Sequence, residues 1–353
     1  MMRTIMPRTI ALLASLLLLI PSGAAHAQDS LACGDGDVIS SPPTLWHVTV
    51  GDGVSCTLDG AALHGSVIVE GGSVTIRDSD ILGDVRVSDT AAATRLVRSN
   101  VYGTVSIDDA GPVLIDRGAL ADVAVSHSSG AVEIRHAELG GSLSIDNGSG
   151  KIMVADVEGT ELTDLMVVEH VGSIEVTDSD IGDFTVRETG RPVILTGVFV
   201  DGDVTVAESG RVEMQRSESG RPSALDGDLE ISDVDGKVRI LDITTAGDVS
   251  ISGSGAIAFR GNDSSNENVE LLGNSGPVLV EGNVRLGLTV GGNGEVGVYG
   301  NSFTEADVSG NSGSVEIAGN AFDSLLCEGN AASPEDLGGN SVGESADGQC
   351  AGF

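Results

Sequence analysis

Apolar and polar residues alternate along most of this chain in short stretches that repeat at intervals of about twenty residues. In one copy, Ile174 and Val176 alternate with polar neighbours, a polar corner follows, and Phe184 and Val186 then alternate before Gly190 opens the next copy. A period of two residues is typical of a β-strand that buries one face. Each copy therefore predicts two short strands separated by corners rich in Gly, Asp, Asn and Ser, which tolerate tight turns.

The repeat itself decides the architecture. Eleven glycines open successive copies: Gly111, Gly130, Gly150, Gly172, Gly190, Gly210, Gly236, Gly255, Gly276, Gly294 and Gly313. A unit of this length with two short strands cannot bury its own apolar face, so it has to stack on its neighbours. The pattern predicts an all-β fold, a single-stranded parallel β-helix of about fourteen coils. Its expected hand is right-handed, the usual hand of parallel crossovers.

Composition agrees with a narrow solenoid core. Only 3% of the residues are aromatic, and glycine supplies 50 of 353. Stacked Val, Ile and Leu side chains suit such an interior. We expect a repeat domain over residues 48–330, with an N-terminal cap over 28–47 and a C-terminal cap over 331–353.

Stacking should align equal corner positions into columns, and asparagine marks two of them. After the first strand the column reads Asn262, Asn283, Asn301 and Asn320, and after the second strand it reads Asn274, Asn293, Asn311 and Asn330. Stacked amides can bond to their copies above and below, as in cross-β assemblies. These columns are predicted to be structural ladders.

The first 27 residues read as a signal peptide. Arg3 and Arg8 precede an apolar run, and Ala25-His26-Ala27 has the small-x-small form of a cleavage site. The run is too short to span a membrane. We expect an exported protein, either extracellular or periplasmic, with no integral membrane span.

Four cysteines bracket the repeat array. Cys33 and Cys56 lie at its start, and Cys327 and Cys350 lie at its end. In an exported chain such cysteines are expected to form disulfides. Because the open ends of a solenoid must be covered, we expect Cys33–Cys56 and Cys327–Cys350 to hold the two caps.

The chain is strongly acidic, with 53 Asp and Glu against 18 Lys and Arg and a formal net charge of −35. The charge therefore disfavours nucleic acids and anionic membrane surfaces as partners, since both are bound by basic patches. Part of the acidity is columnar, because five aspartates stand directly before the second strand: Asp164, Asp183, Asp203, Asp228 and Asp248. Ca²⁺ is a candidate ligand for stacked carboxylates. The alternative is that these aspartates only make turn hydrogen bonds.

A carbohydrate-active enzyme is the alternative function. Pectate lyases and polygalacturonases carry their sites on the outer face of a β-helix. Here Glu175 and Glu213, roughly 10 Å apart if two coils separate them, are the candidate carboxylate pair. No HExxH, GxSxG or phosphate-loop motif occurs, so no catalytic residue is assigned.

The repeats and the Gly-Asn corners from Leu326 to Cys350 resemble the right-handed parallel β-helix repeat proteins that bacteria secrete. The resemblance implies the fold and no activity. Polymerising bactofilin-like β-helices are similar in period, but the signal peptide and closed ends differ from theirs. The sequence thus predicts an exported, non-enzymatic structural or adhesive element of the cell surface or exterior. A surface polysaccharide or a protein is its expected partner.

Overall fold

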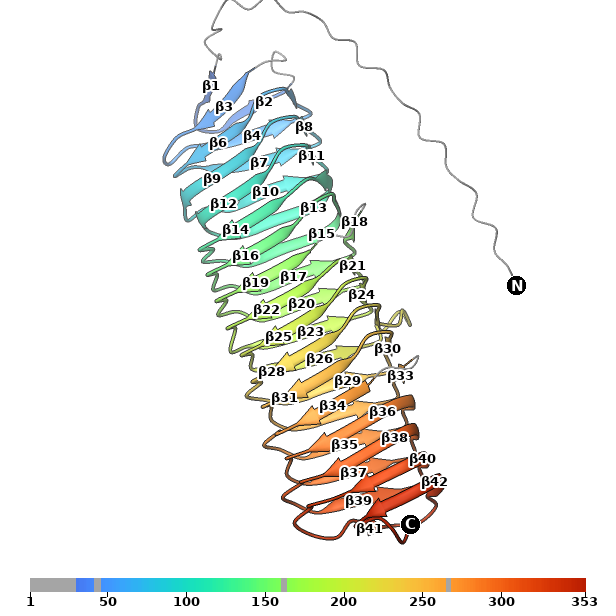
Figure 1. Cartoon of the computed structure of the whole chain (residues 1–353). Helices are drawn as coiled ribbons and strands as arrows, with labels where there is room; N and C mark the ends of the chain where they lie inside the picture. Colours follow the sequence, from blue (N-terminus) through green and yellow to red (C-terminus); the bar gives the residue numbers. More distant parts are fainter. Residues whose placement is uncertain (1–29, 41–45, 160–163, 265–267) are drawn as a thin grey trace, which may run out of the picture.

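Parallel pairing between equal positions of successive coils organises the whole molecule. The computed structural model describes residues 30–40, 46–159, 164–264 and 268–353, and there the chain forms an all-β parallel solenoid of about 16 turns (Figure 1). The predicted fold class is confirmed. The predicted signal peptide over residues 1–27 lies outside the described residues.

One face of the solenoid consists of the first strand of each coil. These strands pair only in parallel, for example β20 with β23 through Ile174 opposite Val193. Their bounds are β2 (Asp37–Ile39), β4 (Ser55–Asp59), β7 (Ser73–Arg77), β10 (Thr94–Val97), β13 (Val113–Leu120), β15 (Val132–Leu139), β17 (Ile152–Ala155), β20 (Ile174–Thr177), β23 (Pro192–Thr196), β26 (Arg211–Gln215), β29 (Val238–Leu241), β32 (Ile257–Arg260), β35 (Val278–Glu281), β37 (Val296–Tyr299), β39 (Val315–Ala318) and β41 (Glu335–Asp336).

The opposite face consists of the second strand predicted for each coil. Here too the register is kept from coil to coil, as where Phe184 of β22 lies opposite Val204 of β25. The bounds are β1 (Ser30–Cys33), β3 (His47–Val50), β6 (Val67–Glu70), β9 (Val85–Thr90), β12 (Val105–Ala110), β14 (Val123–Ser126), β16 (Leu143–Asp146), β19 (Leu165–Val168), β22 (Phe184–Arg187), β25 (Val204–Ala207), β28 (Leu229–Ser232), β31 (Val249–Ser252), β34 (Asn268–Leu272), β36 (Val284–Gly291), β38 (Ser302–Ser309), β40 (Ala321–Cys327) and β42 (Ser341–Gly348).

A third, two-residue strand joins the two faces in many coils, which the sequence pattern did not predict. It turns one side chain inward, which is apolar at Ile81, Ile181 and Val200 and polar at Thr245. The short strands are β5 (Ala62–Leu63), β8 (Asp80–Ile81), β11 (Asn100–Val101), β18 (Glu158–Gly159), β21 (Asp180–Ile181), β24 (Phe199–Val200), β27 (Ala224–Leu225), β30 (Thr244–Thr245) and β33 (Asp263–Ser264). From β36 onward the short strand and the second strand merge into one continuous strand of seven or eight residues.

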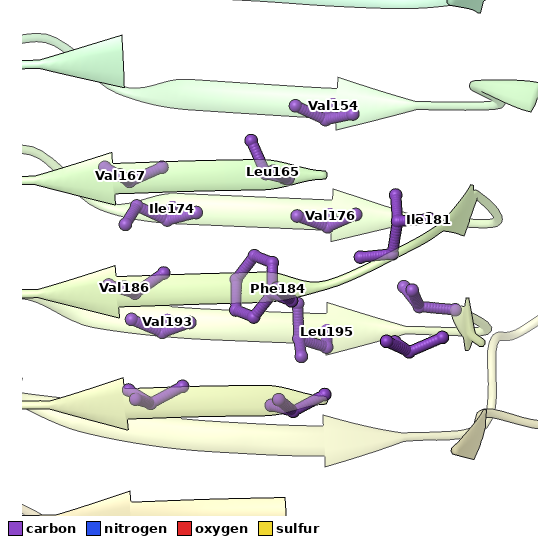
Figure 2. Close-up of a cluster of buried hydrophobic side chains, with 14 of the residues drawn as sticks. Val154, Leu165, Val167, Ile174, Val176, Ile181, Phe184, Val186, Val193 and Leu195 are labelled. Carbon is purple, nitrogen blue, oxygen red and sulfur yellow. The ribbon is translucent and has the colours of Figure 1, made fainter. Parts of the chain in front are cut away.

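The interior is one continuous aliphatic core. The alternating residues that define the repeat, including Ile174, Val176, Phe184 and Val186, are all fully buried. Figure 2 shows these side chains meeting between the two faces, each coil contributing a layer. Since neighbouring strands lie about 4.8 Å apart, about 16 turns make a rod of roughly 70 Å.

The solenoid has more turns than the fourteen predicted, because parallel pairing continues into both predicted caps. Within 28–47, β1 pairs with β3 and β2 pairs with β4. Within 331–353, β41 pairs with β39 and β42 pairs with β40. These terminal coils escape detection because their strands are short or largely exposed and carry little apolar alternation.

Both corners that follow a long strand contain a residue with positive φ. In the last coils this residue is glycine, as at Gly300 (φ 63°) and Gly310 (φ 68°). In the earlier coils it is usually another residue, and glutamates occupy three successive coils at Glu169, Glu188 and Glu208, with φ between 51° and 55°. Residues other than glycine adopt this conformation at a cost of about 1–2 kcal/mol each. The earlier corners are therefore less favourable locally than the later ones.

This difference predicts that Glu188→Gly stabilises the fold. The substitution relieves the left-handed conformation and removes one carboxylate from a column of three, while glycine adds freedom to the unfolded chain. We expect a net gain of about 0.5–1 kcal/mol, measured by equilibrium denaturation. Glu230→Gly is the matched control, because Glu230 is exposed within the extended strand β28. It removes the same charge and should lower stability; equal effects of the two variants would contradict the corner argument.

Candidate functional site

The asparagines of the first predicted column are stacked in successive coils and joined by their side chains. The Oδ1 atom of Asn301 accepts hydrogen bonds from the backbone N–H of Asn283 (2.8 Å) and from its Nδ2 (2.9 Å). The Nδ2 of Asn301 donates to the carbonyl of Val280 and to Oδ1 of Asn320. Asn301 is 3% exposed, so its amide is buried with both ends satisfied. The same pattern repeats at Asn262, Asn283 and Asn320.

The second predicted column has the same geometry. Asn274, Asn293, Asn311 and Asn330 are bonded in order through Oδ1 acceptors. Both columns run one residue further than the sequence pattern suggested. Asn340 continues the first column, and Gln349 ends the second by accepting the N–H of Asn330 at 2.9 Å. Gln349 could not be found by searching for asparagine, since its longer side chain reaches the same position from a different backbone site.

Five aspartates also lie in one exposed column, at the corner before the second strand. Oδ1 of Asp164 accepts the backbone N–H of Asp183 at 3.1 Å. The same bond continues through Asp203, Asp228 and Asp248, with donor–acceptor distances of 2.8–2.9 Å. Asn268 takes the next position and donates its N–H to Asp248. Each carboxylate therefore has a structural role in joining its coil to the next one.

The aspartate column does not form a recognisable metal centre. No group of three or more His, Cys, Asp or Glu side chains able to hold a metal ion occurs in the part of the chain that the structure describes. Stacking puts one carboxylate in each coil, about 4.8 Å from the next, and leaves each facing solvent. The bonds of these aspartates run between coils and are not the local turn hydrogen bonds expected as the alternative to Ca²⁺ binding, which stays a prediction.

The two predicted disulfides are present near the two ends. Cys33 bonds to Cys56 and Cys327 bonds to Cys350. Each bridge spans 23 residues of sequence and joins a terminal coil to its neighbour. Phe353 packs partly buried against the core beside the second bridge, and the chain end is folded back by hydrogen bonds from Gln349 to Cys327 and from Phe353 to Cys350.

The candidate carboxylate pair of the enzyme hypothesis is occupied by ion pairs. Glu175 lies 2.5 Å from Nζ of Lys151, and Glu213 lies 2.9 Å from Nη1 of Arg239. Glu213 is only 8% exposed. Each glutamate thus has one carboxylate oxygen bound to a basic group of another coil, and the two do not face each other as a free carboxylate pair.

Three polar contacts on the outer surface involve titratable groups with shifted pKa values. The hydrogen bonds that Asp108 accepts from Ser126 and His127 lower the pKa of that carboxyl, and the same bond raises the pKa of His127. Burial by itself raises the pKa of Asp116. The hydrogen bond from His136 and the charge of the nearby Arg135 have the larger combined effect, so the pKa of Asp116 is lowered overall. Tyr299 donates to Glu316 at 2.5 Å, and this bond raises its pKa to about 12. Each shift is explained by a contact that also links neighbouring coils.

The surface carries only shallow hollows in the described residues. One, of about 410 Å³, lies on the merged strands of the last coils and is lined by Glu305, Asp307, Asp347, Ser324 and Ser345, among others. Another of about 410 Å³ lies at a corner beside the ion pair of Arg260 and Glu281. Neither is walled by a long loop. In the described ranges, no helix is long and apolar enough to cross a membrane.

One enlarged corner is held by an arginine that the sequence analysis did not single out. Residues 216–222 form an insertion between β26 and β27, and Arg221 reaches back to the carbonyl of Asp178 (2.7 Å) and the carboxylate of Asp180. Ser217 accepts the backbone N–H of Arg221 within the insertion. These bonds fasten the insertion to the side of the rod, so it does not wall a cleft.

The ladder geometry predicts that Asn301→Ala is strongly destabilising. It leaves two buried donors of Asn283 and the carbonyl of Val280 without partners, and each unsatisfied group costs about 1–3 kcal/mol. We expect a loss of about 2–4 kcal/mol in the free energy of unfolding, measured by denaturant titration. Asn340→Ala is the control: Asn340 accepts the same two bonds but is partly exposed, so water can replace them. Equal losses at both positions would show that burial does not set the cost.

The aspartate column predicts that Asp203→Asn keeps the full stability and that Asp203→Ala lowers it slightly. An amide oxygen can still accept the N–H of Asp228, whereas alanine leaves that donor to water at this exposed corner, at a cost of at most about 1 kcal/mol. Melting temperatures should be the same with Ca²⁺ and with a chelator. A Ca²⁺-dependent rise in wild type that Asp203→Asn removes would instead establish a cation site.

Comparison with known proteins identifies no relative of this chain. No family model, no curated protein and no solved structure matches the chain. The structure itself shows the parallel β-solenoid.

Proposed function

We propose that this protein is an exported, non-enzymatic rod that serves as a structural or adhesive element at the cell surface or outside the cell. The observation that supports this most is the unbroken stacking of about 16 turns on one core. Inward polar corners are bonded from coil to coil in the later turns. Such a structure offers length and rigidity, and its chemistry is limited to its outer surface.

The outer surface supports a display role better than catalysis. The outward glutamates considered for catalysis are held in ion pairs, and the hollows are shallow and lie away from long loops. Catalytic sites on solenoids need several polar groups converging around a substrate. Side chains that repeat once per coil instead offer an extended, regular surface to a long partner such as a polysaccharide.

Export is supported by the N-terminal pattern and by the disulfides. Disulfides persist in oxidising compartments, and here two of them use all four cysteines. The extracellular space and the periplasm both satisfy this condition.

Charge favours a discrete rod over an end-to-end polymer. Residues 28–76 and 286–353 contain no lysine or arginine, and the second range contains ten acidic residues. Two such ends repel one another, and acidic side chains on exposed edge strands discourage strand pairing between molecules. The terminal strands β41 and β42 carry Glu335, Asp336, Glu344 and Asp347.

The alternative function is a carbohydrate-active enzyme, and one observation favours it. The hollow on the merged strands of the last coils combines hydroxyl groups with Glu305, Asp307 and Asp347, the groups that bind and hydrolyse sugars. Because no basic residue lies beyond Arg285, this site would suit a neutral chain and repel a polyuronate.

Incubation of the mature protein with neutral and acidic polysaccharides tests the two functions. We expect no new reducing ends and no unsaturated products, together with retention of the protein on at least one insoluble polysaccharide or on isolated cell envelopes. Glu305→Gln and Glu175→Gln are the matched variants. Cleavage that Glu305→Gln abolishes and Glu175→Gln preserves would overturn the structural proposal in favour of the enzyme.

A further inference from the structure

The first-corner column has no side-chain oxygen in three successive coils near the middle of the rod. At the first corner, the inward position is held by Ser79 and Ser99, then by Gly118, Ala137 and Val157, before serine returns at Ser179. Ser79 and Ser179 accept backbone N–H bonds from the preceding coil. The three residues between Ser99 and Ser179 have no side-chain oxygen to do so. At this corner the coils are joined by strand pairing and apolar contact, while polar links such as Lys151–Glu175 and Asp164–Asp183 join them on the outer surface.

A histidine occupies the inward position of the second corner in the same stretch. His170 lies between Gly148 of the preceding coil and Thr189 of the following coil, and it is only 1% exposed. Its Nε2 lies 2.6 Å from the carbonyl oxygen of Gly150. Since a carbonyl accepts but never donates, Nε2 carries the proton and Nδ1 has the free lone pair in the neutral ring. Nδ1 is buried and has no hydrogen-bond partner.

Two glycines make room for the imidazole. A Cβ atom added to Gly148 would lie 2.7 Å from Nδ1, and one added to Gly172 would lie 2.7 Å from Nε2. The ring is thus enclosed by backbone on both sides. A proton added to Nδ1 would create a buried charge and a buried N–H donor without an acceptor, both of which are unfavourable.

No opposite charge on the neighbouring corners contacts the ring. The preceding coil carries Asp146 and Lys151, the histidine's own corner carries Glu169, and the following coil carries Arg187, Glu188 and Arg191. Glu169, Glu188, Lys151, Arg187 and Arg191 are exposed and Asp146 is partly exposed. The Arg191 guanidinium is bonded to the carbonyl of Val171, the residue after His170, and is itself positive. A protonated His170 would have no counter-ion inside the solenoid.

From this geometry we propose that the second corner at His170, where the ring packs between Gly148 and Thr189 of the neighbouring coils, is an acid-sensitive joint. Protonation opens this joint and loosens the middle of the rod, while the disulfides keep both ends closed. Binding of a proton to the imidazole of His170 is the only binding event that this opening requires.

The direction of the pH effect follows from burial. Desolvation lowers the pKa of His170 in the folded state, and its bond to Gly150 only partly opposes this. The folded state therefore binds fewer protons than the unfolded state below about pH 6.5, the value for an exposed histidine. The stabilisation is complete above that pH and is lost as the pH falls through the lower, folded-state pKa.

Hydrogen exchange of the full mature chain, with disulfides intact, tests the joint. Rates at pH 7.5 and pH 5.0, corrected for intrinsic chemistry, give opening constants for the joint peptides, within 143–159 and 164–190, and for reference peptides within 296–340. In wild type, the opening of the joint peptides should rise at pH 5.0 by up to about 30-fold, the limit set by the ordinary histidine pKa of about 6.5. The reference region should change little. His170→Thr, which places the residue type of Thr189 in the column, should remove the rise.

Two further measurements make the result decisive. His127→Asn is the matched control, because His127 is exposed and its pKa is raised by Asp108; this variant should keep the acid-induced opening of the joint peptides. Should His170→Thr fail to fold, NMR titration of the wild-type imidazole replaces it. A His170 that titrates at or above pH 6.5, or an opening that is identical in wild type and His170→Thr, overturns the proposal.

Discussion

The structure depends on one constraint: every coil must present its backbone and its inward polar groups in register with the coil beside it. Strands of about four residues contribute few hydrogen bonds each, so a coil is stable only when both neighbours complete its pairing. The apolar interior meets this constraint easily, because Val, Ile and Leu stack without directional demands. The corners do not, since their buried amides and carbonyls must each find a partner. The asparagine, serine and aspartate columns are the means by which those partners are supplied.

The chain meets the corner constraint differently along its length. In the last coils, a glycine with positive φ precedes an asparagine that bonds to both neighbours, so the turn and the ladder are favourable together. In the earlier coils, aspartate, glutamate, arginine or histidine takes the left-handed position, and serine, a small apolar residue or His170 points inward. Ion pairs between coils, such as Arg98 with Asp78 and Arg77 with Asp59, join the outer surface there. These exposed pairs contribute little individually, so the two parts of the rod differ in local stability.

The sequence predicted those features that repeat and missed those that depend on a single coil. Ile174, Val176, Phe184 and Val186 were assigned to the core because alternation with a period of two identifies inward positions. Asparagine columns were visible because the same residue returns at each interval. The two-residue strand β21 could not be predicted, since two residues show no alternation. The buried position of His170 was also hidden, because only the backbone at Glu169, with its positive φ, turns the following residue inward. Ion pairing of Glu213 likewise depends on Arg239 in another coil, which no local pattern reveals.

The placement of the two disulfides determines how the rod would respond to mechanical load. Strand hydrogen bonds in a solenoid run parallel to its axis, so tension on the chain ends would peel coils away one after another. Cys33–Cys56 and Cys327–Cys350 each connect the terminal coil covalently to the coil next to it. A pull applied at either terminus therefore bypasses the outermost turn, which is the one with the fewest neighbours, and is transmitted to coils that are paired on both sides. The two disulfides therefore prevent the terminal coils, where unravelling would begin, from separating from the rod.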